Sequence, residues 1–71
     1  MEARVRIYKY GHSDNWVCRI KWNEAQIPWS VWDEYTSTQF RTKEACITNV
    51  VAFCTRNNLE WNGENEEGKQ W

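Results

Sequence analysis

Residues 15–34, NWVCRIKWNEAQIPWSVWDE, decide the fold, because this short stretch holds four of the six tryptophans in the chain. Within it, residues 16–22 alternate in the pattern that is typical of a half-buried strand. Successive side chains on a strand point to opposite faces, so one face receives Trp16, Cys18, Ile20 and Trp22. The other face receives Val17, Arg19 and Lys21. The segment therefore predicts a strand with one face toward a core.

The second half of the stretch predicts another strand, after a polar link at residues 23–26. In residues 27–34, IPWSVWDE, one face carries Ile27, Trp29 and Val31, and the other carries Pro28, Ser30 and Trp32. Pro28 has no N–H to donate, so we expect it at the start of the strand or on a sheet edge. The following residues 35–40, YTSTQF, either extend this strand or form a connecting loop.

A further strand is predicted upstream, in residues 4–10, RVRIYKY, where Val5 and Ile7 alternate with Arg4, Arg6, Tyr8 and Tyr10. Residues 11–15, GHSDN, are turn formers that connect it to the tryptophan-rich stretch. The three segments together predict a three-stranded antiparallel meander.

The rest of the chain predicts one helix. Thr42 is a suitable N-cap for residues 43–57, in which apolar side chains recur on one face: Cys46, Ile47, Val50, Val51, Phe53 and Cys54. Asn57 and Asn58 favour a left-handed stop, with Leu59 placed for the accompanying apolar contact and Trp61 expected to close over the same core. The expected fold class is α+β, β-β-β-α, with a single domain at residues 1–61 and a flexible acidic tail at 62–71.

A single helix covers only one face of a sheet, so strand parity predicts a covered and an uncovered face. The covered face is expected to carry Val5, Ile7, Trp16, Cys18, Ile20, Trp22, Ile27, Trp29 and Val31. The uncovered face is expected to carry Arg4, Arg6, Tyr8, Tyr10, Val17, Arg19, Lys21, Ser30 and Trp32.

Cations and aromatic rings alternate on that uncovered face. Tyrosine, tryptophan and arginine are enriched at binding hot spots, which makes this face a candidate binding surface. The residues proposed for it are Arg4, Arg6, Tyr8, Tyr10, Arg19, Lys21 and Trp32. Four alternatives stay open: an ordinary solvated sheet face, a homodimer interface, a surface for another protein, or a surface for nucleic acid.

Composition limits the classes of protein. The net charge of −1 argues against a dedicated nucleic-acid binder. No segment is apolar enough for a signal peptide or a membrane span, so we expect a cytoplasmic protein without a membrane partner. The three cysteines, Cys18, Cys46 and Cys54, lack C-x-x-C spacing, which favours buried thiols in a reducing compartment over one disulfide with a free thiol.

Catalytic patterns are not found in the sequence. His12 lies beside Ser13 and Asp14 in a turn, where neighbouring groups seldom converge as a triad does. The paired carboxylates at 33–34 and 66–67 have no histidine or cysteine neighbour that would indicate a metal or acid–base site. The sequence therefore predicts a protein that is not an enzyme and that has no cofactor and no metal ligands.

The segments RIYKYGHSDNWVCRIKW and EYTSTQFRTKEACITNV resemble the YegP-like family of small domains over residues 5–55. The matching positions are Tyr8, Lys9, Trp16, Arg19, Ile20, Tyr35, Lys43, Ala45 and Cys46. The resemblance implies a β-β-β-α unit that often occurs in pairs, and it transfers no catalytic residues. The chain departs from the family at residues 23–26, where the family has Asn-Gly, and in its tryptophan-rich third strand.

Two looser similarities bear on partners. The arm-binding domains of phage integrases place a three-stranded sheet on DNA, and Arg4, Arg6, Arg19 and Lys21 would be the corresponding cations. Small acidic inhibitors from phages resemble this chain in size and in their lack of catalytic groups. The acidic residues Glu60, Glu64, Glu66 and Glu67 either engage a basic partner or serve solubility. The leading hypothesis is a non-catalytic protein-binding module, an inhibitor or decoy of phage or mobile-element type; nucleic-acid binding is the alternative.

Overall fold

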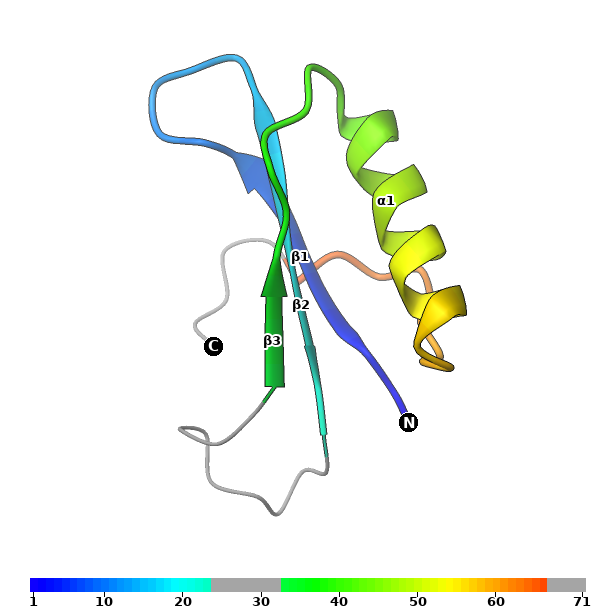
Figure 1. Cartoon of the computed structure of the whole chain (residues 1–71). Helices are drawn as coiled ribbons and strands as arrows, with labels where there is room; N and C mark the ends of the chain where they lie inside the picture. Colours follow the sequence, from blue (N-terminus) through cyan, green and yellow to red (C-terminus); the bar gives the residue numbers. More distant parts are fainter. Residues whose placement is uncertain (24–32, 67–71) are drawn as a thin grey trace.

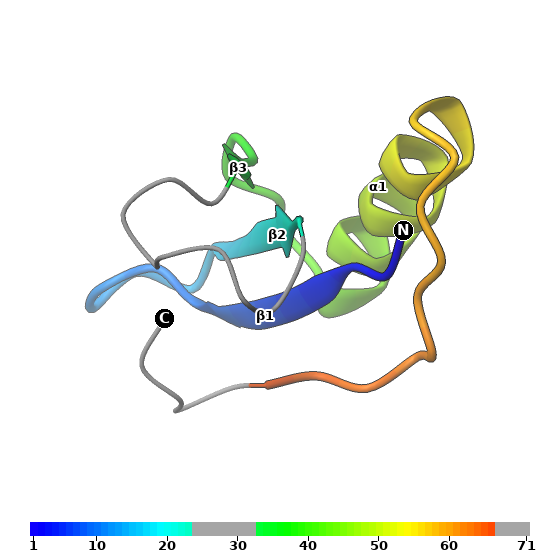
Figure 2. The same ribbon diagram turned by 90° about the horizontal axis from the view of Figure 1, so that it is seen from below.

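A computed structural model describes residues 1–23 and 33–66, and Figure 1 shows its three strands and one helix. The elements follow in the order β1 (Arg4–Lys9), β2 (Trp16–Trp22), β3 (Asp33–Thr36) and α1 (Lys43–Arg56). The strands form one antiparallel sheet in the order β1-β2-β3, with β2 in the centre. The helix covers one face of this sheet (Figures 1 and 2). The predicted α+β meander with a single C-terminal helix is confirmed.

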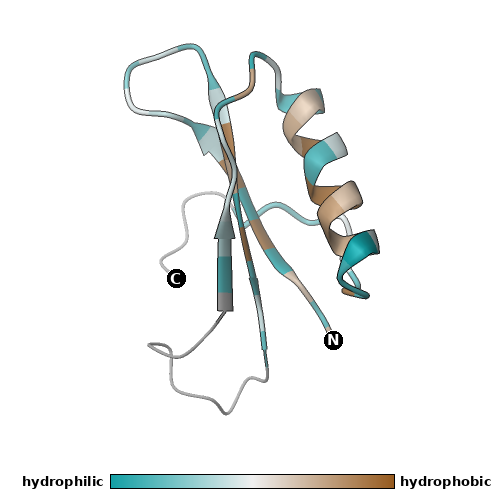
Figure 3. Ribbon diagram, viewed as in Figure 1, coloured by the Kyte–Doolittle hydropathy of each residue, from teal (hydrophilic) through white to brown (hydrophobic). Residues whose placement is uncertain are grey.

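The core forms where the alternation of β1 and β2 places apolar side chains in register. Val5 lies opposite Ile20, and Ile7 lies opposite Cys18. All four are fully buried, together with Cys46 and Val50 of α1. Trp16 and Trp22 pack against this cluster and are partly buried. Complete burial of an aliphatic side chain contributes about 1.5–3 kcal/mol, so these few residues carry much of the stability of so small a chain. Figure 3 shows the apolar colour on β1, on β2 and along α1.

The third strand continues beyond the predicted residues 27–34. In the described part of the chain β3 spans Asp33–Thr36, so it contains residues 33 and 34 of the prediction and extends over residues 35 and 36. Residues 24–32, which include Ile27, Pro28, Trp29, Ser30, Val31 and Trp32, lie outside the described residues. Tyr35 pairs with Ile20 and shares its face, so it points toward the helix. There it stacks on Phe53 with a distance of 4.3 Å between ring centroids, and Trp22 approaches the same Phe53 ring at 5.4 Å.

The segment after β3 stays beside β2, but its pairing is irregular. Ser37 takes the place of a ladder residue: its N–H donates to the Cys18 carbonyl at 3.0 Å, and its hydroxyl accepts from the Cys18 N–H at 2.9 Å. Phe40 then pairs with Trp16 through two backbone hydrogen bonds of 2.6 and 2.7 Å. Residues 35–40 are therefore strand at their start and an interrupted extended segment afterwards.

Both predicted ends of the helix are confirmed. The Thr42 hydroxyl accepts from the Ala45 N–H at 3.1 Å, which satisfies one of the free N–H groups of the first turn. At the other end Asn58 has a φ of +54°, and the Leu59 N–H donates to the Cys54 carbonyl at 2.9 Å. This is a Schellman closure, in which a left-handed residue turns the chain back over the last turn. It carries Leu59 and Trp61 onto the core.

The three cysteines are free and buried, as the sequence predicts. Burial among apolar groups disfavours the thiolate, and it raises the pKa of Cys46 to about 11, with the nearby Cys18 thiol adding to the shift. Burial likewise raises the pKa of Cys54. A reducing cellular compartment stays a prediction.

The chain beyond α1 runs alongside the outer edge of β1 (Figure 2). The Ala3 N–H donates to the Glu60 carbonyl at 2.7 Å, and the Glu66 N–H donates to the Val5 carbonyl at 2.7 Å. Residues 62–66 were expected in a flexible tail, but in the structure they end in contacts with β1; residues 67–71 lie outside the described residues.

The raised pKa of Cys46 predicts a loss of stability at alkaline pH. The unfolded thiol ionises near 9.0 and the folded thiol only near about 11, so deprotonation favours the unfolded chain as pH rises through this window. A shift of this size corresponds to about 2–3 kcal/mol. Denaturant unfolding at pH 8 and pH 11 should therefore show a smaller decrease in the free energy of unfolding for Cys46→Ala than for the wild type. Equal decreases in both chains would contradict this assignment.

Candidate functional site

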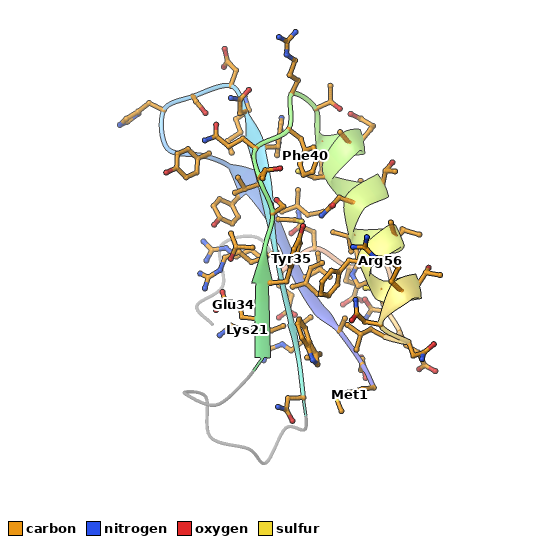
Figure 4. All side chains as sticks on the ribbon, viewed as in Figure 1. Met1, Lys21, Glu34, Tyr35, Phe40 and Arg56 are labelled. Carbon is orange, nitrogen blue, oxygen red and sulfur yellow. The ribbon has the colours of Figure 1, made fainter. Side chains whose placement is uncertain are left out.

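The candidate site is the face of the sheet turned away from α1, which we call the open face. By strand alternation it carries Arg4, Arg6, Tyr8, Val17, Arg19, Lys21, Glu34 and Thr36. Figure 4 shows Lys21 and Glu34 on the side of the sheet opposite the helix, whereas Tyr35 lies on the helix side. Tyr10 follows directly after β1 and lies near Tyr8. The structure thus brings together every predicted binding residue except Trp32, which lies outside the described residues.

Arg4 and Arg19, two of the predicted binding cations, each pair with a carboxylate from the described part of the chain. Arg4 holds Glu66 in a forked contact, with Nη2 at 2.9 Å from Oε1 and Nε at 3.1 Å from Oε2. This hydrogen bonding raises the pKa of Arg4 above its ordinary value. Arg19 pairs with Glu34, which lies diagonally across on β3, two residues from Thr36, the direct partner of Arg19 in the register. Sequence analysis considered residues 33–34 only as a paired carboxylate without a histidine or cysteine neighbour, and it did not identify either ion pair.

The prediction that this face is uncovered is wrong at two positions of β2. Val17 is 3% exposed and Lys21 is 4% exposed. Both lie on the central strand, where cross-strand neighbours flank a side chain from both sides: Lys21 lies between Arg4 and Glu34 in the register. Loss of hydration is the main cause that lowers the pKa of Lys21, and the positive charges of Arg19 and Arg4 lower it further. Lys21 is therefore not presented to a partner.

Arg6 is the remaining cation of the set. Its guanidinium carbon lies 4.9 Å from the centroid of the Tyr8 ring, which is a cation–π distance. Its Nε is buried and has no hydrogen-bond partner among the residues that the structure describes. Arg6 and Tyr8 are both half-buried, so each limits the motion of the other. This pair links the charged part of the open face to its aromatic end.

A hollow of about 330 Å³ lies at this aromatic end. It is lined by Tyr8, Tyr10, Val17, Thr36, Ser37, Thr38 and Gln39. Its position follows from the irregular pairing after β3. Gln39 is held there because its Oε1 accepts from Asn15 Nδ2 at 2.9 Å. The hollow therefore combines two phenol rings with hydroxyl and amide groups, and the described residues that line it include no charged side chain.

Sequence analysis identified Tyr8 and Tyr10 but missed residues 36–39 as part of the site. The signal that could have identified them was the run Thr36-Ser37-Thr38-Gln39, in which three hydroxyl residues are followed by an amide. Such a run can supply hydrogen bonds at a surface, but its composition alone is equally typical of a connecting loop. The pairing of Ser37 with Cys18 decides between these interpretations, and it is a long-range contact.

The groups considered for catalysis are not gathered into a site. His12 and Asp14 are both exposed in the turn between β1 and β2. Within residues 1–23 and 33–66, no cluster of three or more histidine, cysteine, aspartate or glutamate side chains could hold a metal ion. No helix in the described part of the chain is long and apolar enough to span a membrane.

Comparisons with family models, with curated proteins and with solved structures found no match to this chain. The resemblance to the YegP-like domains therefore stays a prediction.

Proposed function

We propose that this chain is a non-catalytic protein-binding module whose contact surface is the aromatic end of the open face. The observation that carries the proposal is the hollow lined by Tyr8 and Tyr10. Tyr10 is 53% exposed, although it is one of the largest side chains on this surface. Tyrosine combines a large apolar ring with a hydroxyl that stays hydrated or bonds a partner, which is why it is enriched at interfaces.

The side chains around the hollow are held by neighbouring residues, which supports binding of a protein partner there. Tyr8 is held by Arg6, and Gln39 is held by Asn15, so less conformational entropy is lost when a partner binds. Thr36 and Thr38 also line the hollow, and their hydroxyls can supply polar contacts to a partner. A hollow of about 330 Å³ is at the small end of ligand sites, so it fits one or two side chains of a protein segment. An apolar or aromatic side chain on an exposed loop of the partner has the matching chemistry.

The nucleic-acid alternative has less support from the same surface. It relies on Arg4, Arg6, Arg19 and Lys21. Arg4 and Arg19 are already paired with Glu66 and Glu34, and Lys21 is buried. A phosphate backbone would have to break two ion pairs in a chain whose net charge is −1. The uncharged lining of the hollow is better suited to a protein surface.

The proposal extends to how such a module acts. A module without a catalytic group works by occupying a surface of its partner, which is the action of an inhibitor or decoy. A phage or mobile-element origin is also part of this proposal. A second copy of the chain could occupy the same face, so homodimerisation through Tyr10 is included. Sedimentation at micromolar concentration, with Tyr10→Ser as the variant, separates a homodimer from a complex with another protein.

Selection from a random displayed-peptide library tests the binding surface directly. The immobilised full-length chain should enrich peptides that carry an aromatic or large apolar anchor. Tyr10→Ser should weaken binding of the selected peptides at least tenfold, roughly 1.4 kcal/mol, because it removes the exposed ring of the hollow. Val51→Ser is the matched control, since Val51 is 49% exposed but lies on the helix.

The control defines what would count against the proposal. Peptides whose affinity is unchanged by Tyr10→Ser and by Tyr8→Ser would place the binding surface elsewhere. Failure to enrich any peptide over an unrelated immobilised protein would remove the hollow from consideration.

Fluorescence anisotropy with single-stranded and duplex DNA tests the alternative. We expect no saturable binding at low salt, because Arg4 and Arg19 are paired and Lys21 is buried, which leaves Arg6 alone among the four predicted cations. A steep decrease in affinity with rising salt, reduced by Arg6→Gln and Arg19→Gln, would support the nucleic-acid surface instead.

A further inference from the structure

The outer edge of β1 is paired by the chain's own C-terminal segment. In an antiparallel sheet, alternate residues of an edge strand direct their N–H and C=O groups away from the neighbouring strand. In β1 these are Val5, Ile7 and Lys9, and residues 65 and 66 bond three of the outward groups of Val5 and Ile7. The Val5 carbonyl accepts from the Glu66 N–H at 2.7 Å. The Ile7 N–H donates to Asn65 Oδ1 at 2.8 Å, and the Ile7 carbonyl accepts from Asn65 Nδ2 at 3.1 Å.

Asn65 takes the place of a strand residue through its side chain. A carboxamide offers a donor and an acceptor together, which a neighbouring strand residue offers with its backbone. Asparagine and glutamine are the residues whose side chains supply both groups. Aspartate would lack the donor for the Ile7 carbonyl. The edge therefore distinguishes an amide side chain from a carboxylate at this position.

Arg4 makes the next position specific. Its guanidinium contacts both carboxylate oxygens of Glu66, at 2.9 and 3.1 Å. A forked contact of this kind fits the planar geometry of a carboxylate and adds orientation to charge. Together with Ile7 and Val5, Arg4 recognises two consecutive residues, an amide followed by a carboxylate. This is more specificity than covering a bare strand edge requires.

The segment is held in a way that allows it to leave. Trp61 packs against the core, but none of residues 62–66 belongs to the core or to its packed layer. A turn separates the two parts: Gly63 has a φ of +86°, and the Glu64 N–H donates to Asn62 Oδ1 at 2.9 Å. Detachment of residues 64–66 breaks their hydrogen bonds and ion pair with β1 and the hydrogen bond that Trp61 Nε1 donates to the Glu64 carbonyl at 2.9 Å. It removes no residue of the apolar core cluster. Terminal segments held in this way open at a low free-energy cost.

We propose that the outer edge of β1, with Arg4, is a binding site for an extended acidic peptide segment in which asparagine is followed by glutamate. In the isolated chain residues 65 and 66 occupy this site, and a partner protein that presents the same pair displaces them. The mode is a variant of strand addition to a sheet edge. One main-chain hydrogen bond joins the segment to Val5, the asparagine side chain bonds Ile7, and Arg4 binds the carboxylate. This inference concerns the edge of the sheet and is independent of the hollow on the open face.

Peptide binding to a chain with a weakened resident segment tests the proposal. The full-length double variant Asn65→Ala, Glu66→Ala is titrated with the peptide GENEEG, which copies residues 63–68. We expect saturable binding that shifts the NMR signal of the Ile7 amide. The wild-type chain should bind the peptide at least tenfold more weakly, because its own segment competes at an effective concentration on the order of millimolar. Adding Arg4→Gln to the double variant should weaken binding at least fivefold.

Two controls make the outcome decisive. The scrambled peptide EEGNGE has the same charge and composition but no asparagine before glutamate, so it should bind at least tenfold more weakly. Hydrogen exchange provides a separate check that the segment has left the edge. The Ile7 amide should be protected in the wild type and lose protection in the double variant, whereas the Arg6 amide, which faces β2, should keep it.

Three results would overturn the proposal. The double variant could release the edge, as seen by exchange at Ile7, and still take up no GENEEG peptide. The scrambled peptide could bind equally well, which would reduce the site to nonspecific charge attraction. A mixed dimer of wild-type and double-variant chains without uptake of free peptide would mean that the occupant is a second copy of this chain.

Discussion

The structure depends on the position of β2 in the centre of the sheet, where it is hydrogen-bonded on both edges. As the central strand it hydrogen-bonds to β1 and to β3, so its side chains have no freedom to change faces without breaking both ladders. Cys18 and Ile20 are fully buried under the helix. Their neighbours Val17, Arg19 and Lys21 are thereby fixed on the opposite face, where they organise the open face. The core and the candidate surface are consequences of one alternating heptapeptide.

Local patterns accounted for much of this fold. The alternation in residues 4–10 and 16–22 predicts β1, β2 and their faces, because a period of two is set by backbone geometry alone. The N-cap Thr42 and the stop at Asn57 and Asn58 are likewise local signals. β3 was harder: the pattern in residues 27–34 predicts a strand but gives no signal that the strand continues over residues 35 and 36. The contact that distinguishes Tyr35 is its stacking on Phe53, eighteen positions later and beyond the reach of a pattern.

The sequence predicted which residues lie on the candidate site, but it did not predict which of them are ion-paired or buried. Parity placed Arg4, Arg6, Tyr8, Arg19 and Lys21 on one face, and the structure agrees. Parity cannot say which of these charges is compensated, because Glu66 reaches Arg4 from sixty-two residues away. It also cannot say that Lys21 is covered by its neighbours. Because of these tertiary contacts, the hollow at Tyr8 and Tyr10 is more accessible on the open face than the basic side chains. The same contacts pair the outer edge of β1 with residues 65 and 66.

The central claim is that strand alternation separates a helix-covered face from an open face. Nuclear Overhauser contacts between side chains in solution test it most directly. We expect strong contacts between the rings of Tyr35 and Phe53, whose centroids are 4.3 Å apart, and contacts from Ile20 to the helix. The side chains of Tyr8 and Arg19 should contact each other's strands but not α1. Contacts from Tyr8 or Arg19 to helix residues would contradict the account, because both faces of the sheet would then have been assigned the wrong way round.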